Sequence, residues 1–261
     1  MVSLSEKRSG MNKWEMYDRL IDGIPEDIVV EDYCVGCAWT LVKAGGYDGV
    51  ALTVRQRAGN PHNDVKIIGE PLKKVAELVK SWYFLEASIG LAAINAYYNT
   101  PMRVGEIGLL EEGADGDDKG DAFKVFGEAV TGKKVAVIGH FPYIEKRLKP
   151  ICDLSILERD PQRGDCPDSS CEYILPEQDY VFITGMTLTN KTLPRLLELC
   201  SNAKVCVVGP SAPLTKILGD YGVYCVSGFC ATDKEVIAES IRRGVKQEIF
   251  KGGQMVNLFT K

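Results

Sequence analysis

The sequence is poor in several features that mark particular classes of protein. It has only two histidines, His62 and His140, so a histidine-rich metal cluster is excluded. It has no apolar run long enough to span a membrane, and residues 1–10 are polar and lack the apolar core of a secretion signal. We therefore expect a cytoplasmic protein that does not associate with membranes.

The excess of basic residues that is typical of nucleic-acid-binding proteins is also missing. Lysine and arginine number 31 against 36 aspartates and glutamates, which gives a net charge of −5. We therefore expect no nucleic-acid partner. A hydrophobic content of 45% in 261 residues is enough for a self-contained core. Such a core and the negative net charge together favour a monomer.

Three well-known site motifs do not occur in the chain. The dinucleotide fingerprint G-x-G-x-x-G, the Walker A sequence and the nucleophile elbow G-x-S-x-G are all missing. A dinucleotide bound through that fingerprint is therefore disfavoured. Rossmann-like loops can bind nucleotides without it, so a nucleotide-binding enzyme stays open as an alternative.

Nine cysteines are present, and their odd number without a secretion signal predicts reduced thiols. Cys34 and Cys37 have C-x-x-C spacing, but an offset of three along a strand places side chains on opposite faces, so we expect simple burial. Cys166 and Cys171 flank a polar loop. Together with Cys230 they support an alternative function, that of a non-catalytic protein that binds a soft metal through thiolates.

The first half of the chain reads as an α+β domain over residues 1–112. An apolar stripe from Trp14 to Ile21 predicts a helix. Two strands are expected at 28–39 and 49–55, joined by a hairpin turn, and two helices at 71–80 and 83–98. An acidic, glycine-rich loop at 113–121 leads to the second domain. It lacks the ligand order and the glutamate of an EF-hand, so calcium is not expected.

The second half, residues 113–261, alternates strands with helices, which predicts a Rossmann-like doubly wound parallel sheet. The expected strands are 134–138, 153–158, 180–184, 204–208 and 223–227, and the expected helices are 143–149, 191–200, 214–221 and 233–243. Five strand ends then deliver loops to one sheet edge, at 139–141, 158–160, 185–190, 209–213 and 228–230. Ligands of open α/β sheets bind at this edge.

His140 is the only titratable imidazole among these loops, so we expect it to act as a general acid or base, or as a single metal ligand. Hydroxyl and amide groups near helix starts favour binding of anionic oxygens, although the same groups could simply cap helices. The expected ligand-binding residues in the loops are Gly139, Phe141, Thr187, Thr189, Asn190, Thr192, Gly209, Pro210, Ser211 and Gly228.

Four strings in order carry a resemblance that covers nearly the whole chain. They lie at 86–96 (EASIGLAAINA), 137–142 (VIGHFP), 184–192 (TGMTLTNKT) and 208–214 (VGPSAPL). In them the chain resembles the family named Putative heavy-metal chelation. The resemblance implies an enolase-N-terminal-like domain followed by a Rossmann-like domain, with a site in the cleft between them. It implies a protein of heavy-metal chelation or detoxification that binds a small anionic or metal-chelating ligand, as an enzyme or as a carrier. The cofactor is undefined beyond a divalent or heavy-metal ion.

Asn95 and Asn99 lie four residues apart on the second apolar helix, hence on one face of it. A buried amide needs hydrogen-bond partners. Either this face lines the cleft and both asparagines orient the ligand, or both bond to backbone carbonyls.

Overall fold

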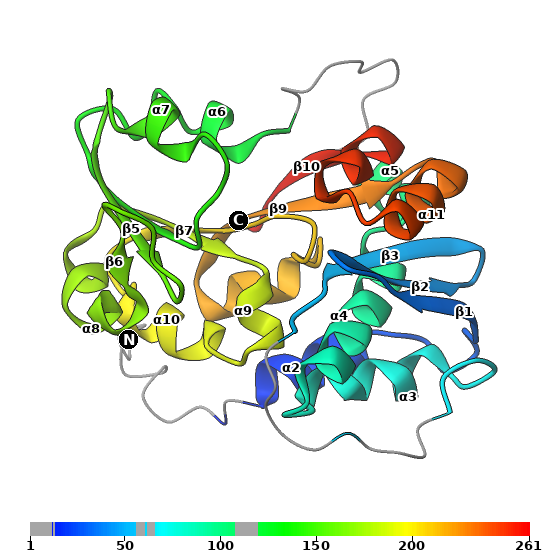
Figure 1. The fold of residues 1–261 in the computed structure, drawn as a ribbon. Coiled ribbons are helices and arrows are strands. Elements are labelled where there is room, and N and C mark those ends of the chain that lie inside the picture. The colour runs from blue at the N-terminus through cyan, green and yellow to red at the C-terminus, as the bar shows by residue number, and fades with distance from the viewer. Residues whose placement is uncertain (1–11, 13, 56–60, 62–65, 108–119) are drawn as a thin grey trace.

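Two β-sheets of different size organise the chain in the computed structural model, which describes residues 12, 14–55, 61, 66–107 and 120–261 (Figure 1). His62, most of the acidic loop and the domain boundary expected at 112/113 lie outside these residues. Within the described part, no helix combines the length and the apolar character that a bilayer crossing requires.

The smaller sheet is an antiparallel meander in the order β1-β2-β3, built from Val30–Val35, Trp39–Ala44 and Tyr47–Leu52. Gly45 and Gly46 have positive φ values of 57° and 75°, and they form the tight turn of the expected hairpin. The single strand expected at 28–39 is wrong, because the chain bends at residues 36–38 and starts a new strand at Trp39. Cys34 and Cys37 are both exposed, so the burial expected for them is wrong as well.

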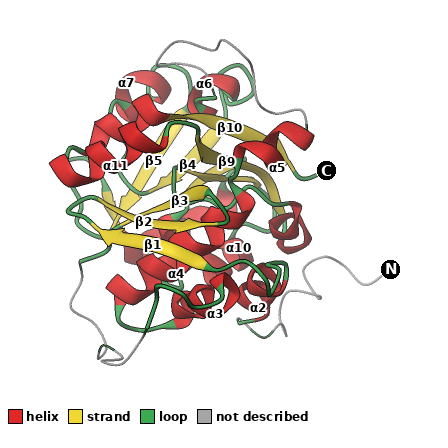
Figure 2. Cartoon of the chain, turned by 90° about the vertical axis from the view of Figure 1, so that its right-hand side faces the viewer, coloured by secondary structure: helices red, strands yellow, loops and turns green. Residues whose placement is uncertain are grey.

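Helices pack on one side of this sheet (Figure 2). They are α2 (Glu15–Asp22), α3 (Leu72–Ala76), the 3-10 turn η1 (Glu77–Lys80) and α4 (Phe84–Tyr98), whereas the next helix, α5 (Pro101–Glu106), contacts β9 of the larger sheet. Almost every residue of α4 is buried, because the helix has the small sheet on one side and the C-terminal half on another. An apolar helix without a polar face is what such a central position requires.

The larger sheet has seven strands in the order β10-β9-β8-β7-β4-β5-β6, and all neighbours are parallel except β10 and β9. The strands are β4 (Lys134–Ile138), β5 (Asp153–Glu158), β6 (Cys166–Pro167), β7 (Tyr180–Thr184), β8 (Lys204–Val208), β9 (Val223–Ala231) and β10 (Gly253–Phe259). α6 (Ala122–Val125) precedes the first of these strands. The helices and turns between the strands are α7 (Ile144–Leu148), η2 (Asp168–Ser170), α8 (Cys171–Ile174), η3 (Leu175–Glu177), α9 (Met186–Thr189), α10 (Leu193–Leu199), η4 (Lys216–Tyr221), α11 (Lys234–Arg243) and η5 (Lys246–Gly252). The expected mixed α/β architecture with a mainly parallel second sheet is confirmed.

One edge loop was assigned wrongly from the sequence. Residues 228–230 belong to β9, which continues to Ala231 because β10 pairs with it along its whole length. Gly228 therefore lies inside a strand. A side chain there would collide with the carbonyl oxygen of Ala212 and with Leu214, so glycine serves close packing at this position.

A single buried cluster joins the two halves of the chain. It includes Leu91 and Ile94 of α4 together with Leu188 and Leu214 from the second half. The other face of the large sheet has its own cluster, which contains Val137 and Phe182. The two halves therefore share a core, and the loops of the large sheet are held against α4.

Candidate functional site

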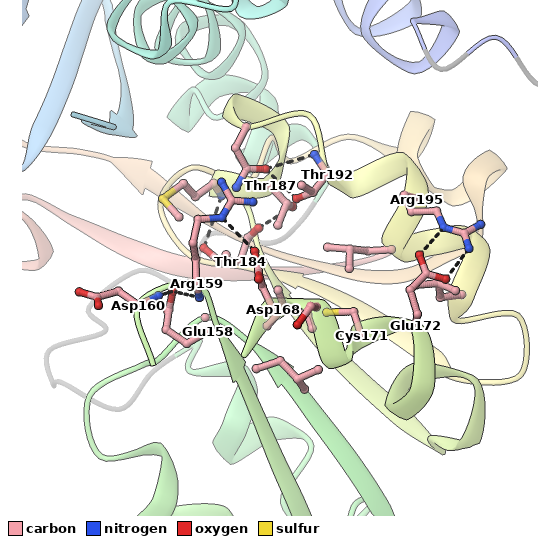
Figure 3. A pocket seen from close by; sticks show the side chains of 18 of the residues that line it. Glu158, Arg159, Asp160, Asp168, Cys171, Glu172, Thr184, Thr187, Thr192 and Arg195 are labelled. Carbon is pink, nitrogen blue, oxygen red and sulfur yellow. Dashed lines mark hydrogen bonds and ion pairs between the residues drawn. The ribbon is translucent and has the colours of Figure 1, made fainter. Parts of the chain in front are cut away.

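A pocket of about 430 Å³ lies at the carboxyl edge of the large sheet (Figure 3). Gly139 after β4, Glu158 at the end of β5 and Thr184 at the end of β7 all line it. The chain moves from β4 outward through β5 and β6, then returns to place β7 on the other side of β4. Such a reversal of strand order is where open α/β sheets bind their ligands.

We call the apolar lining side chains of this pocket its floor and the polar and charged ones its rim. Among the described residues the floor consists of Ile138, Leu157, Cys171, Met186, Leu196 and Leu199 together with Val54, the only one of them from the first half of the chain. Thr184, Thr187, Asn190 and Thr192 bring hydroxyl and amide groups. An apolar cavity with a few convergent polar groups is typical of a small-molecule site.

The charged groups of the rim are mostly paired with one another. The Arg159 Nε donates to Asp168 at 3.1 Å, and Arg195 binds Glu172 through two nitrogens at 2.9 and 2.5 Å. Figure 3 shows these two pairs on different sides of the pocket. The lining carboxylates are Glu158, Asp160, Asp168 and Glu172, and the lining guanidiniums are Arg159 and Arg195. Among the described lining residues, four negative charges against two positive ones make the rim acidic.

The hydroxyl groups expected to hold an anion bond largely to the protein itself. The Thr187 hydroxyl donates to the Thr184 carbonyl at 2.7 Å. The Thr192 hydroxyl and backbone N–H both donate to the Asn190 side-chain oxygen, at 2.6 and 3.1 Å. This arrangement fits the alternative in which these residues organise the start of α10.

His140 is held by an aspartate that sequence reasoning missed. Its Nδ1 lies 2.9 and 3.2 Å from the two carboxylate oxygens of Asp165, and that carboxylate also accepts from the Gln162 N–H. The Asp165 side chain is only 1% exposed. When Nδ1 donates its proton to Asp165, Nε2 is left as a proton acceptor. No sequence motif links these residues, which lie 25 positions apart and meet because β4, β5 and β6 are neighbours in the sheet.

His140 touches the pocket through its backbone. Its N–H donates to Glu158 at 2.8 Å, and Glu158 also accepts the Arg159 N–H at 2.6 Å. The imidazole itself is outside the pocket lining. Of the residues expected from the sequence, the pocket brings together Gly139, Thr187, Asn190 and Thr192.

The two asparagines of α4 join the halves of the chain. The Asn95 amide donates to the carbonyls of Val50, at 2.8 Å, and Pro210, at 3.3 Å. The Asn99 amide donates to Ala212 and Phe229, at 3.0 and 3.1 Å, and its oxygen accepts the Leu214 N–H at 2.7 Å. Both side chains are buried and bond to backbone groups. This agrees with the alternative in which the asparagines bond to backbone carbonyls and do not orient a ligand.

The remaining expected residues pack beside this junction or in the core. Ser211 accepts the Leu52 N–H at 2.8 Å, and Thr189 is fully buried. The Phe141 ring packs 5.2 Å from that of Phe123. Gly209 takes a φ of 106° next to Pro210. Phe141, Thr189, Gly209, Pro210, Ser211 and Gly228 are not among the pocket-lining residues.

The described residues do not form a metal centre of their own. Among them, no three histidine, cysteine, aspartate or glutamate side chains come close enough together to hold an ion. Burial raises the pKa of the Cys171 thiol to about 11 and that of Cys230 to about 12. Without a metal both thiols are therefore protonated at neutral pH, so metal binding there would have to displace the protons.

Two models of protein families match successive parts of this chain. The first covers residues 17–98 and the second residues 121–260, and both read "Putative heavy-metal chelation". The chain belongs to the Putative heavy-metal chelation family. The resemblance drawn from its four motifs is thereby confirmed.

Solved structures of the same family have this fold. A protein of unknown function from Desulfitobacterium hafniense is 42% identical, with a TM-score of 0.86 over 95% of this chain and 98% of that one. A second, from Pyrococcus horikoshii, is 20% identical and has a TM-score of 0.78 over 95% of this chain and all of the other, which supports the fold alone. An uncharacterized protein of Methanocaldococcus jannaschii is 27% identical over 241 residues, which are 87% of this chain and 88% of that protein.

Proposed function

We propose that this protein binds a small metal chelator together with its metal in the pocket at the carboxyl edge of β4, β5 and β7. The observation that supports this most strongly is the pocket itself, a cavity of about 430 Å³ at the point where the strand order reverses. The family description supports a ligand connected with heavy metals.

A chelate fits this site better than a bare ion does. The described residues supply no cluster of three metal-ligating side chains, so most of the ligands of a bound metal must come from another molecule. The apolar floor suits the organic part of such a molecule, and the threonine and asparagine rim suits its polar atoms. The metal is therefore cargo in this proposal.

The charge of the rim decides which chelates are favoured. The described residues surround the pocket with four carboxylates and two guanidiniums, so a cationic or neutral complex is favoured over an anionic one. Of the two ligand classes expected from the sequence, anionic or metal-chelating, this proposal keeps the metal-chelating one. The same charge disfavours the phosphates of a nucleotide.

A bulky substitution at the mouth of the pocket is expected to weaken binding. Ser169 is an exposed lining residue, so Ser169→Trp fills space without disturbing the core. The cationic nickel–bipyridine complex is expected to bind the native protein and to bind Ser169→Trp about tenfold more weakly, a cost of about 1.4 kcal/mol. Isothermal titration calorimetry measures both affinities.

The control is Ser201→Trp, an equally exposed serine beside the amino end of β8, at the opposite edge of the sheet. It is expected to bind within about twofold of the native protein. Nickel chloride alone and the anionic nickel–citrate complex are expected to give no saturable heat. Equal weakening by both tryptophans, or saturable binding of nickel chloride alone, would contradict the proposal.

His140 stands beside the pocket in this proposal. Its backbone N–H donates to the lining residue Glu158, while its imidazole is outside the lining. The His140→Gln variant is therefore expected to bind the nickel–bipyridine complex within about threefold of the native protein, a change of less than about 0.7 kcal/mol. Isothermal titration calorimetry measures the affinity, and a loss of about tenfold or more would show that the imidazole takes part in binding.

A further inference from the structure

The side chain of Lys191 lies in an unusual environment outside the pocket. Lys191 joins α9 to α10 and has a φ of 64°, in the left-handed region that side chains other than that of glycine rarely adopt. Its flanking residues Asn190 and Thr192 line the pocket, but Lys191 does not. Backbone strain of this kind persists where the surrounding structure holds a residue in one orientation.

The amine points to the corner between η1 and α4. The Lys191 Nζ donates to the carbonyl oxygen of Ser81, in a short contact, and to that of Thr189 at 2.7 Å. The nitrogen lies 5.5 Å from the ring centre of Trp82 and 5.0 Å from that of Phe84. Two carbonyls and two rings therefore hold the amine in place.

No carboxylate of the described residues forms an ion pair with this amine. The charged groups on the facing elements have other partners. Lys80 pairs with Asp18 and Glu77 at 2.5 and 2.8 Å, and Glu86 accepts a hydrogen bond from the Ser81 hydroxyl at 2.6 Å. A half-buried ammonium without a counter-ion is costly, because burial removes its hydration and no opposite charge replaces it.

We propose that Lys191 is a nucleophilic amine that condenses with aldehydes and ketones, and that the exposed indole of Trp82 is the platform on which a ring-bearing carbonyl compound lies. The neutral amine attacks the carbonyl carbon to form a C–N bond, and the carbonyl oxygen becomes a hydroxyl as the nitrogen loses a proton. Loss of water then leaves an imine. The sum of the two steps is amine plus carbonyl compound giving imine plus water, with no oxidant or reductant.

Burial also makes the neutral form of this amine accessible, because it lowers the pKa of Lys191 to about 8. At pH 8 about half of such amines are neutral, against roughly one in 250 for a lysine of ordinary pKa. Trp82 is 58% exposed, so part of its side chain is open to a ligand. Nucleophilicity falls together with basicity, so we expect a reactivity gain of about tenfold rather than a hundredfold.

The experiment uses the full chain with pyridoxal as the aromatic aldehyde and propanal as the aliphatic one. Borohydride traps the imine and peptide mass spectrometry locates it. Lys191 is expected to be labelled about tenfold faster than Lys204, with a rate that rises with pH around a midpoint near 8. Lys204 is the internal control, because its amine also lies near two rings, those of Tyr180 and Tyr224 at 5.6 and 5.1 Å, but the residue is exposed.

Two variants separate the roles of amine and platform. Lys191→Arg keeps the positive charge and is expected to lose the label at this position. Trp82→Ala removes an exposed side chain and is expected to slow labelling by pyridoxal several-fold while leaving propanal unaffected. Labelling of native Lys191 no faster than that of Lys204 would overturn the proposal. Equal effects of Trp82→Ala on both aldehydes would show that the Trp82 indole is not the platform for the ring of the carbonyl compound.

Discussion

Replacing Asn99 with alanine is expected to lower the free energy of unfolding by about 4 kcal/mol. The Asn99 side chain is 2% exposed and makes hydrogen bonds to three backbone groups of the second half of the chain. Its removal leaves the carbonyls of Ala212 and Phe229 and the N–H of Leu214 without this partner in a dry interior. Each unsatisfied group costs about 1–3 kcal/mol.

A loss of this size is a large share of the 5–15 kcal/mol that stabilises a typical domain. Urea unfolding followed by circular dichroism measures it. The matched control is Asn257→Ala, because the Asn257 amide makes one hydrogen bond, to the Gly120 carbonyl at 3.0 Å, and the residue is only half-buried. That change is expected to cost about 1 kcal/mol. Similar losses for the two variants would show that Asn99 does not join the halves as its contacts indicate.

Replacing Gly49 with alanine is expected to cost about 4 kcal/mol or more. Gly49 lies in β3 where α4 crosses the small sheet, and a Cβ built on it overlaps the backbone nitrogen of Ala96 and the carbonyl oxygen of Ala92. Backbone atoms inside a helix cannot rotate away as side-chain ends can. The whole of α4 would have to move off β3, which exceeds the usual 1–3 kcal/mol cost of overpacking.

The control for this prediction is Gly127→Ala. At Gly127 a Cβ would lie 3.3 Å from the Lys124 carbonyl oxygen and 3.6 Å from that of Phe123, and its backbone φ is not positive. We expect that change to stay within about 1 kcal/mol. Thermal and urea unfolding of both variants test the difference. A Gly49→Ala protein as stable as Gly127→Ala would mean that α4 does not rest on β3 as closely as the structure indicates.

Patterns that are local in the chain predicted the second half well. β4, β5, β7 and β8 begin and end at the expected residues. For β4, β7 and β8 the reason is that a strand buried on both faces is a continuous apolar run, which can be recognised from the sequence. β10 was missed because it is an antiparallel edge strand whose partner β9 was expected to end four residues too early. β1 and β2 were merged because the bend between them at residues 36–38 has only Gly36 as a local signal.

The pocket, too, could be predicted from the sequence only in part. That Gly139 and the 184–192 segment meet at one edge followed from the parallel order of the strands. The pairing of Arg159 with Asp168 and of Arg195 with Glu172, which sets the charge of the rim, could not be read from the sequence. These partners lie 9 and 23 residues apart without a shared period, so only the packing of η2 and α8 on the sheet brings them together.

By itself, the sequence determined the family, the α/β character, the strand ends that build the site and the common face of Asn95 and Asn99, because each rests on residues within a few positions of one another. The tertiary structure alone decided what those residues meet. It joined Asn99 to the 212–214 loop, set Asp165 against His140 and gave Lys191 no counter-ion among the residues that the structure describes. Hydrogen bonds, desolvation and charge act across space, so their partners are fixed only when distant segments pack.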